Sequence, residues 1–381
     1  MRIIVAPDSY KGSISALGVA EAMERGIKKV FAQAEVLKLP IADGGEGTVE
    51  ALVSATGGRF FRKEVTGPLG EPVAALWGVL GDGKTAVIEM ASASGLPLVP
   101  PDKRNPCLTT TLGTGQLVRE VLDQGLPRLI LGIGGSATND GGAGFASALG
   151  IRFLDADGKE LPAGGQALSR LARIDTSGVD PRLDRLSLTV ACDVDNPLCG
   201  PRGASAIFGP QKGACPDTVA VLDNALRHYG EQACAITGRQ IMDRAGAGAA
   251  GGLGAALLFF TRAELRPGID IVLEAIDFDR LSAGVDLVIT GEGRTDRQTA
   301  FGKAPVGVAK IAKRHGVPVV CLSGGLGEGY EAIFEQGIDA AAVCPAAPMT
   351  LEDCLAQGPA LVETAAERLC RTLKAGMSLR G

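Results

Sequence analysis

The stretch LILGIGGSATNDGGAG, residues 129–144, decides the expected fold because it joins a strand to a helix through a polar, glycine-rich turn. Its first three residues are apolar and β-prone and predict a buried strand. The small residues from Ala143 to Leu149 predict a helix. A helix start offers unpaired backbone N–H groups that attract anions, above all phosphate. A tight turn without a ligand is the alternative, but the glycine and hydroxyl positions around Asp140 favour a site.

The two ends of the chain repeat this strand, polar turn, helix pattern. Arg2 to Pro7 and Val36 to Ala42 predict strands that end in polar turns, and helices follow both. Asp286 to Thr290 and Val317 to Ser323 predict two further strands near the C-terminus. Such alternation is typical of open α/β sheets, in which ligands bind beyond the carboxyl ends of the strands.

The middle of the chain has a different pattern. Phe60 to Thr66, Val73 to Leu80 and Thr85 to Met90 predict strands joined by short turns, hence hairpins. We therefore expect an α/β protein of two α/β domains. The first is discontinuous, with an open and mostly parallel sheet, and the second is inserted into it. The expected boundaries are 1–65 plus 285–381 for the first domain and 66–284 for the inserted one.

Composition limits the class of function. The chain has 381 residues, 46% hydrophobic and 21% charged, which fits a globular protein. Its net charge of −5 argues against nucleic acid as the main partner but leaves a small anionic substrate open. We find no apolar stretch of the ~20 residues that a membrane span needs and no signal peptide. Nine cysteines without a C-x-x-C pair indicate free thiols. The expected location is cytoplasmic.

Nucleotide-binding patterns occur at three places, and each has a structural alternative. At Gly246-x-Gly248-x-x-Gly251 no predicted strand precedes the match, so it favours a flexible loop or a helix-packing seam. Gly78 to Thr85 fits the P-loop pattern, but it lies between two predicted strands, so Asp82-Gly83 predicts a hairpin turn instead. Gly132 to Ala137 fits the loose dinucleotide fingerprint, and Asp155 follows where a ribose-binding acid is expected. Against a dinucleotide, Asp140 would place a negative charge near the pyrophosphate.

Acidic residues at strand ends carry more information than these patterns. An acid at the end of several parallel strands would converge on one edge of the sheet, and clustered carboxylates need a cation such as Mg²⁺. Eight acids fall directly after predicted strands: Asp8, Asp43, Glu46, Asp140, Asp193, Asp195, Glu292 and Asp296. Four cations in the same turns are candidates to neutralise a transferred phosphate: Lys11, Lys212, Arg294 and Lys303. The two histidines neighbour no motif, which disfavours His-based hydrolysis.

Seven motifs together resemble the bacterial class I glycerate kinases over essentially the whole chain. They are DSYKGSISA (8–16), PIADGGEGT (40–48), GIGGSATNDGGAG (132–144), CDVDNPLCGPRGAS (192–205), FGPQKGA (208–214), GAGAAGGLGA (246–255) and ITGEGRTD (289–296). Tyr10 departs from the family, which usually has Phe there.

The resemblance implies ATP-dependent phosphorylation of D-glycerate by a fold that is not a P-loop kinase. It implies 2-phosphoglycerate as the product, although the residues themselves do not distinguish the 2-hydroxyl from the 3-hydroxyl. The expected chemistry is in-line transfer of the γ-phosphoryl group, which needs positioning, charge neutralisation and a base.

Roles are assigned to residues on this basis. Asp193 is the expected base because it follows a rigid apolar strand, and Lys11 is expected to contact the transferred phosphate or the glycerate carboxylate. Substrate or phosphate binding is assigned to Asp8, Ser136, Thr138, Asn139, Asp140, Arg294 and Lys303. Nucleotide binding is assigned to Gly248, Gly251, Gly252, Ser323, Gly324 and Gly325. Mg²⁺ is assigned to Asp43, Glu46 and Asp296.

Two other classes of protein remain open at this point. A nicotinamide-dependent dehydrogenase would use the Gly132 fingerprint, and a non-catalytic protein would bind a small anion. The cluster of acids argues against the second class, because a pure anion binder gains nothing from them. A homo-oligomer is also left open.

Overall fold

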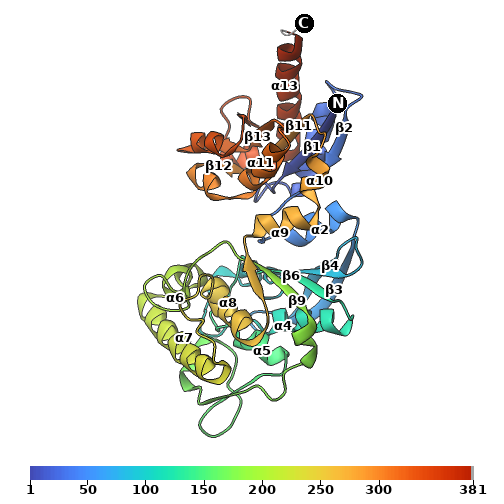
Figure 1. Cartoon of the computed structure of the whole chain (residues 1–381). Coiled ribbons are helices and arrows are strands. Elements are labelled where there is room, and N and C mark those ends of the chain that lie inside the picture. Colours follow the sequence, from blue (N-terminus) through green and yellow to red (C-terminus); the bar gives the residue numbers. More distant parts are fainter. Residues whose placement is uncertain (379–381) are drawn as a thin grey trace. The chain divides into compact units, whose positions relative to one another are not determined.

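The computed structural model describes residues 1–378 and divides into two units, each built around its own sheet (Figure 1). The first unit comprises residues 1–43, 50–57 and 269 onward, and the second comprises residues 44–49 and 58–268. This division assigns residues 58–65 to the second unit and 269–284 to the first, where the sequence suggested the reverse. The reason for the first difference is that the strand at 59–66 pairs along its full length with the next strand.

The first unit has a five-stranded sheet in which every pairing is parallel, in the order β15-β13-β11-β1-β2. Its strands are β1 Arg2–Pro7, β2 Glu35–Lys38, β11 Leu287–Gly291, β13 Val319–Ser323 and β15 Ala340–Val343, and β12 Arg294–Thr295 pairs with β14 Gly325–Leu326. Its helices are α1 Ala16–Lys28, most of α2 Thr48–Thr56 and of α9 Gly268–Ala275, α10 Phe278–Ser282, α11 Ala304–Arg314, α12 Leu351–Ala356 and α13 Gly358–Ser378, with 3₁₀ turns η6 Arg297–Phe301 and η7 Tyr330–Gln336.

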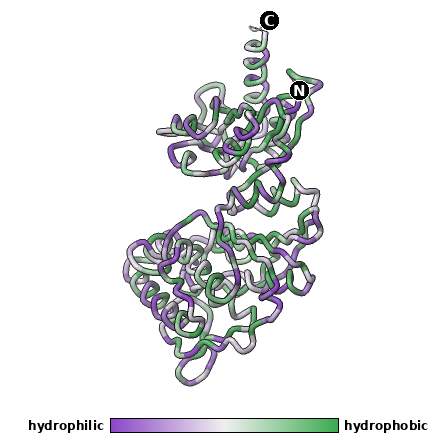
Figure 2. Tube along the Cα trace, viewed as in Figure 1, coloured by the Kyte–Doolittle hydropathy of each residue, from purple (hydrophilic) through white to green (hydrophobic). Residues whose placement is uncertain are grey.

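The central strands of this sheet are buried on both faces, as their apolar sequences require. Helices α1 and α13 come from opposite ends of the chain and pack together over the sheet, so blue and red segments lie side by side in Figure 1. Figure 2 shows hydrophobic and hydrophilic residues alternating along α13, which is the pattern of a helix that packs on one side. The expected strand 36–42 ends at Lys38, and the chain beyond it forms the loop that carries Asp43.

The second unit has a six-stranded sheet in the order β10-β9-β6-β5-β4-β3, parallel from β10 to β5 and antiparallel from β5 to β3. Its strands are β3 Arg59–Thr66, β4 Pro72–Val79, β5 Thr85–Glu89, β6 Arg128–Gly132, β9 Ser187–Ala191 and β10 Glu264–Arg266, and β7 Arg152–Leu154 pairs separately with β8 Arg173–Asp175. Its helices are α3 Ala91–Ser94, α4 Leu112–Asp123, α5 Ala143–Ala148, α6 Ala204–Phe208, α7 Pro216–Thr237 and α8 Ala249–Phe260, with 3₁₀ turns η1 Leu96–Leu98, η2 Pro101–Lys103, η3 Gly165–Arg170, η4 Pro181–Arg185 and η5 Pro210–Lys212.

These observations confirm the α/β class and the rejection of a P-loop. The Gly81–Gly83 turn joins the antiparallel strands β4 and β5, and the Asp82 carboxylate accepts hydrogen bonds from the backbone N–H groups of Lys84 and Thr85 at 2.7 and 2.9 Å. Thr85 begins strand β5 and not a helix, so this turn lacks the helix N-terminus that a P-loop needs.

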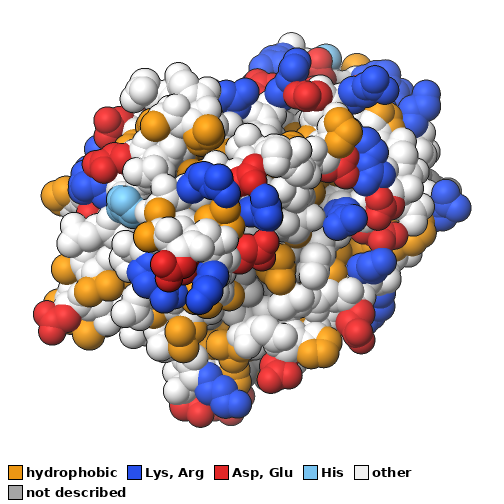
Figure 3. Space-filling view, turned by 90° about the horizontal axis from the view of Figure 1, so that it is seen from below, with side chains coloured by type: hydrophobic (Ala, Val, Ile, Leu, Met, Phe, Trp, Pro, Cys, Tyr) orange, Lys and Arg blue, Asp and Glu red, His pale blue; other side chains and the backbone are white. Residues whose placement is uncertain are grey.

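Surface and hydropathy bear on the expected partners. Within residues 1–378, no helix is long and apolar enough to cross a membrane. On the face drawn in Figure 3, Lys and Arg side chains are interspersed with Asp and Glu rather than gathered in one region. The expectation that nucleic acid is not a partner stays a prediction.

Candidate active site

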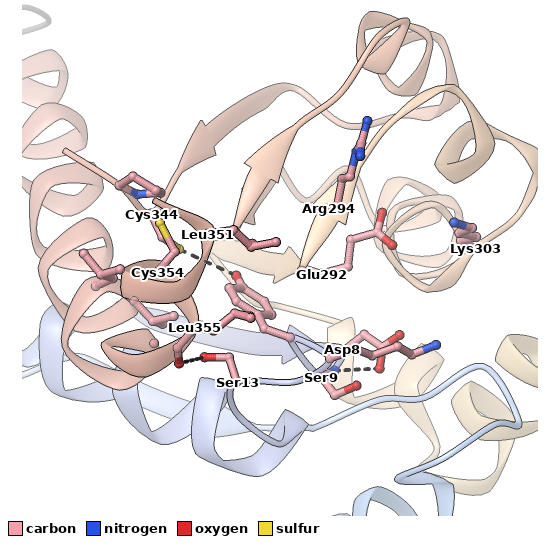
Figure 4. Close-up of a pocket in the computed structure, with 18 of the residues that line it drawn as sticks. Asp8, Ser9, Ser13, Glu292, Arg294, Lys303, Cys344, Leu351, Cys354 and Leu355 are labelled. Carbon is pink, nitrogen blue, oxygen red and sulfur yellow. Dashed lines mark hydrogen bonds between the residues drawn. The ribbon is translucent and has the colours of Figure 1, made fainter. Parts of the chain in front are cut away.

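A cavity of about 440 Å³ lies in the first unit, at the carboxyl ends of its strands. Asp8 follows β1, Glu292 follows β11 and Gly324 follows β13, so the parallel sheet brings three distant segments to one edge. Figure 4 shows Asp8 and Glu292 on either side of the opening, with Lys303 beside Glu292. The charged residues of the lining are Asp8, Lys11, Asp43, Glu292, Arg294 and Lys303. The apolar part of the lining is Tyr10, Cys344, Pro345, Leu351, Leu355, Leu361 and Val362.

Two carboxyl groups in this cavity have raised pKa values. Burial, and after it the nearby charge of Asp43, together raise the pKa of Asp8 to about 7, against the opposing effects of the Ser9 N–H and Lys11. The Ser9 N–H donates to Asp8 Oδ1 at 2.6 Å. Burial also raises the pKa of Glu292, although Thr299 donates a hydrogen bond to it at 2.5 Å. Both groups therefore favour a neighbouring cation or a proton.

Tyr10 anchors the turn that carries Asp8 and Lys11. Its hydroxyl donates to the carbonyl oxygen of Leu322 in β13 at 2.5 Å, and its ring is 5% exposed. Burial raises the pKa of this hydroxyl well above its usual value, so it stays neutral. The residue that departs from the family pattern thus gains a buried partner for its extra polar atom.

The residues expected to hold Mg²⁺ do not form one group. Asp43 lines the cavity of the first unit and Glu46 belongs to the second unit. Asp296 caps η6 by accepting the N–H of Gln298 at 2.9 Å, and it lies 3.8 Å from Arg294. Within residues 1–378, no group of three or more His, Cys, Asp or Glu side chains is arranged to hold a metal ion. The magnesium assignment stays a prediction.

The three residues of the Ser323–Gly325 turn have different surroundings, and only one of them lines the cavity. The Ser323 side chain is fully buried, and its hydroxyl is 2.6 Å from the hydroxyl of Thr295, which in turn donates to Glu292 at 3.3 Å. Gly324 lines the cavity, whereas Gly325 lies in β14. The serine hydroxyl thus supports Glu292 from behind through Thr295.

The Ser136–Asp140 loop of the second unit is organised around a buried acid. The Asp140 carboxylate, 1% exposed, accepts from the N–H and hydroxyl of Thr111, both at 2.8 Å, and from the N–H groups of Gly142 and Gly144 at 3.1 and 3.2 Å. Burial raises its pKa and these four donors oppose the rise. Thr111 was missed by sequence reasoning, because only the folded chain brings it beside a residue 29 positions away.

Other polar groups of this loop are also buried. Lys212, 1% exposed, donates to the Ser136 hydroxyl and to the Thr138 carbonyl oxygen, both at 2.7 Å. Asn139 donates to the Ser205 hydroxyl at 2.9 Å. The Thr138 hydroxyl and the Asn139 side-chain oxygen are buried and make no hydrogen bond within the described residues. Unpaired buried polar atoms are costly, so they indicate that this loop is built to meet a ligand or ordered water.

The glycine-rich segment 246–254 packs closely against this loop. Ala250, Gly251 and Gly252 have left-handed backbone conformations that interrupt α8 near its start. A Cβ on Gly251 would lie 2.0 Å from the Thr138 carbonyl oxygen, and the Gly251 carbonyl accepts the N–H of Gly141 at 3.0 Å. A Cβ on Gly248 would lie 2.2 Å from the Pro197 carbonyl oxygen. The observed role of these glycines is close backbone packing, and nucleotide binding stays a prediction.

Asp193 and the turn that precedes Glu46 lie near the end of β9 in the second unit. Asp193 follows β9, and its Oδ1 accepts the N–H of Gly268 at 2.9 Å. The turn that carries Glu46 approaches the same strand end: a Cβ on Gly44 would lie 2.4 Å from the Cβ of Ala191. Gly44 has a φ of +91°, so this close turn needs glycine on two grounds.

The structure thus groups the predicted residues within each unit. In the first unit, the cavity collects Asp8, Lys11, Asp43, Arg294, Lys303 and Gly324. In the second, Ser136 to Asp140 pack with Gly251, and Asp193 and the turn that precedes Glu46 lie near the end of β9. Asp296, Ser323 and Gly325 do not line the cavity of the first unit. In the sequence, Glu292 was noted as an acid at a strand end but was assigned no role, although it lines the cavity.

Known proteins resemble this chain over its full length. A family model described as the glycerate kinase family matches residues 3–374. The glycerate kinase of Bacillus subtilis (strain 168) is 56% identical over 98% of both chains, and the glycerate 2-kinase of Escherichia coli (strain K12) is 49% identical over 100% of both. A crystal structure of a candidate glycerate kinase 2 from Salmonella typhimurium LT2 matches with a TM-score of 0.90 and 52% identity, covering 99% of each chain.

Proposed function

This chain belongs to the glycerate kinase family, and on that premise we propose that it transfers the γ-phosphoryl group of ATP to D-glycerate. The observation that carries the proposal is the full-length match to a glycerate 2-kinase at 49% identity. The same match supports the 2-hydroxyl as the acceptor and 2-phosphoglycerate as the product. The free state of all nine cysteines, which lie within the described residues, supports a cytoplasmic location.

The cavity of the first unit has the charges that phosphoryl transfer needs. Lys11, Arg294 and Lys303 line it and are suited to neutralise phosphate or carboxylate oxygens. Asp8 and Glu292 have raised pKa values because they are buried near other carboxylates, and a cation would relieve this cost.

Mg²⁺ fits this set of oxygen ligands. It is usually held by one or two carboxylates together with the phosphates of a nucleotide, so a preformed group of three side chains is not required. Asp43 is the magnesium candidate that lines the cavity, and Glu46 and Asp296 remain proposed candidates for Mg²⁺, directly or through water. When bound, Mg²⁺ would neutralise charge on the phosphate oxygens.

Asp193 is proposed as the base that accepts the proton of the glycerate hydroxyl. The hydrogen bond from the Gly268 N–H holds its carboxylate at the end of β9, so its direction is set by the backbone. A carboxylate in this position is suited to take a proton from an alcohol as the phosphoryl group arrives.

Lys11 is proposed to contact the transferred phosphate or the glycerate carboxylate, and Ser136, Thr138 and Asn139 are proposed to face phosphate or substrate. The buried atoms of Thr138 and Asn139 that lack a partner support this role. The glycines at 248, 251, 252, 324 and 325, with Ser323, remain proposed nucleotide contacts.

The dehydrogenase alternative gains no support. Asp155, its expected ribose-binding acid, accepts hydrogen bonds from the N–H groups of Asp157 and Lys159 within a turn. The helix that follows the Gly132 fingerprint begins only at Ala143, too far along the chain for the fingerprint geometry.

The test is an assay of ADP release from ATP and Mg²⁺ with D-glycerate, run beside an assay of NAD⁺ reduction. We expect ADP release that depends on D-glycerate and no reduced nicotinamide. Binding of glycerate in calorimetry without consumption of ATP would instead support a non-catalytic anion binder and contradict the proposal.

A further inference from the structure

Lys212 is a buried cation that the reaction scheme above does not use. It ends the 3₁₀ turn η5, and its side chain is 1% exposed. The Nζ donates to the Ser136 hydroxyl and to the Thr138 carbonyl oxygen, both at 2.7 Å. Burying an ammonium group is costly unless it is paired and hydrogen-bonded, so its presence calls for an explanation.

We propose that Lys212 is a positioning residue that orients the Ser136 hydroxyl so that Ser136 donates its hydrogen to an anionic oxygen of the bound phosphate or carboxylate. This inference rests on the proposed function, since it assumes that the Ser136–Asp140 loop meets such an oxygen during phosphoryl transfer.

The argument follows from donor and acceptor chemistry. An ammonium group has three donors and no acceptor, so the Ser136 oxygen must accept from it. A hydroxyl has a single hydrogen, and no other partner of this hydroxyl exists within residues 1–378 apart from Lys212. The hydrogen therefore remains available to a ligand, and an oxyanion is the acceptor that such a donor stabilises most.

Two neighbouring atoms point independently to a ligand at this loop. The Thr138 hydroxyl and the Asn139 side-chain oxygen are buried without a partner in the described chain. Lys212 also holds the Thr138 carbonyl oxygen, so one side chain sets both the backbone of the loop and the direction of the Ser136 hydroxyl. A lysine with a purely structural role would need the contact with the Thr138 carbonyl oxygen but not the contact with the Ser136 hydroxyl.

Two opposing effects determine the pKa of Lys212. Burial lowers the pKa of Lys212, the charge of Asp140 opposes this effect in part, and the resulting pKa is about 7. Asp140 is held by its own donors from Thr111 and the following glycines. A neutral amine has a lone pair and accepts hydrogen bonds, so above this pH the Ser136 hydroxyl can turn back toward Lys212.

The experiment is a double-mutant cycle on the full chain with Lys212→Met, Ser136→Ala and the double variant. We expect each single variant to lower kcat/KM for glycerate by about 10- to 100-fold, the size of a hydrogen bond to a charged group. Because Lys212 acts through Ser136, the double variant should be within about 3-fold of the weaker single variant. Losses that multiply in the double variant would contradict the proposal.

A pH profile keeps the test decisive if Lys212→Met does not fold. The ratio of kcat/KM for wild type to that for Ser136→Ala should be constant below about pH 7 and fall above it, because kcat/KM reports groups of the free enzyme. A ratio that does not change with pH would overturn the proposal. The matched control is Lys310→Met, which removes an exposed lysine of α11 and should leave kcat/KM unchanged.

The outcomes separate this inference from the proposed function. A wild-type protein that releases no ADP with glycerate contradicts both. An active wild type with multiplicative losses, or with a ratio independent of pH, contradicts only the role of Lys212.

Discussion

The first and second units each bury an aspartate beside a strand-to-helix turn, but the two carboxylates differ in how many hydrogen bonds they receive. Asp8 is 8% exposed and receives one backbone hydrogen bond, from Ser9, so its charge is poorly compensated. Asp140 is 1% exposed and receives four hydrogen bonds that tie its loop together. Burial alone therefore does not identify a reactive acid. The supply of donors decides whether a carboxylate stabilises the fold or remains available to a ligand.

The largest effect is expected at Asp193, the proposed base of the second unit. Asp193→Asn keeps an oxygen that accepts the Gly268 N–H but cannot take a proton, so kcat should fall by about 1,000-fold or more while ATP binding is retained. Steady-state kinetics and calorimetry with ATP measure the two effects. The control is Asp195→Asn, an exposed acid paired with Arg202, which should retain activity. Near-normal turnover of Asp193→Asn would remove Asp193 from the role of base.

The next effect separates the two buried aspartates by stability. Asp140→Asn replaces one acceptor oxygen by an NH₂ group and leaves donors of Thr111 or of the glycines unpaired, which should cost about 3 kcal/mol of unfolding free energy. Chemical denaturation monitored by circular dichroism measures this change. A variant as stable as wild type would show that the network does not organise the loop.

Asp8→Asn should change stability in the opposite direction at pH 8. A folded pKa of about 7 against 3.8 corresponds to at most ~4 kcal/mol at ~1.36 kcal/mol per pKa unit, and we expect about 2 kcal/mol of stabilisation because burying the amide also has a cost.

The pH dependence of this effect follows from the sign of the shift. Well below pH 3.8 Asp8 is protonated in both the folded and unfolded states. As the pH rises to 7, the unfolded state loses its proton first, so wild-type stability falls across this window and then levels off. The gain from Asp8→Asn should therefore be present at pH 8 and absent well below pH 3.8. A gain of equal size at both values would contradict the assigned cause, and loss of activity in the stabilised variant would fit a trade-off between stability and function.

The smallest effect, that of Ala250→Gly, tests the backbone that packs behind the Ser136–Asp140 loop. Ala250 has a φ of +52°, so Ala250→Gly should raise stability by about 1 kcal/mol. Gly251→Ala is the matched opposite, since its Cβ would lie 2.0 Å from the Thr138 carbonyl oxygen and must displace the loop. Thermal unfolding of the two variants should give changes in melting temperature of opposite sign, and equal changes would refute the left-handed turn.

Sequence patterns predicted local structure well where one element decides it. The hairpin at Gly81–Gly83 depends on adjacent residues and was predicted, as was the strand that leads into Gly132. The expected strand 36–42 was too long, because its last residues turn away from the sheet after Lys38. Apolar composition alone does not show where pairing stops.

The candidate site was harder to predict because its chemistry depends on distant contacts. Strand-end acids could be found from the sequence, but whether each is compensated depends on donors such as Thr111 for Asp140 and Thr299 for Glu292. The left-handed interruption of α8 was not predictable either, since it depends on the backbone of Thr138. The sequence indicated which residue types the site contains, and only the tertiary structure shows which of their charges are compensated by hydrogen bonds.

The most direct test of the account is carbon and phosphorus NMR of the product formed from D-glycerate, ATP and Mg²⁺. The account predicts ADP and a phosphorylated glycerate whose phosphorus couples to the carbon that carries the 2-hydroxyl. Unchanged glycerate and ATP after incubation with the folded protein would contradict it.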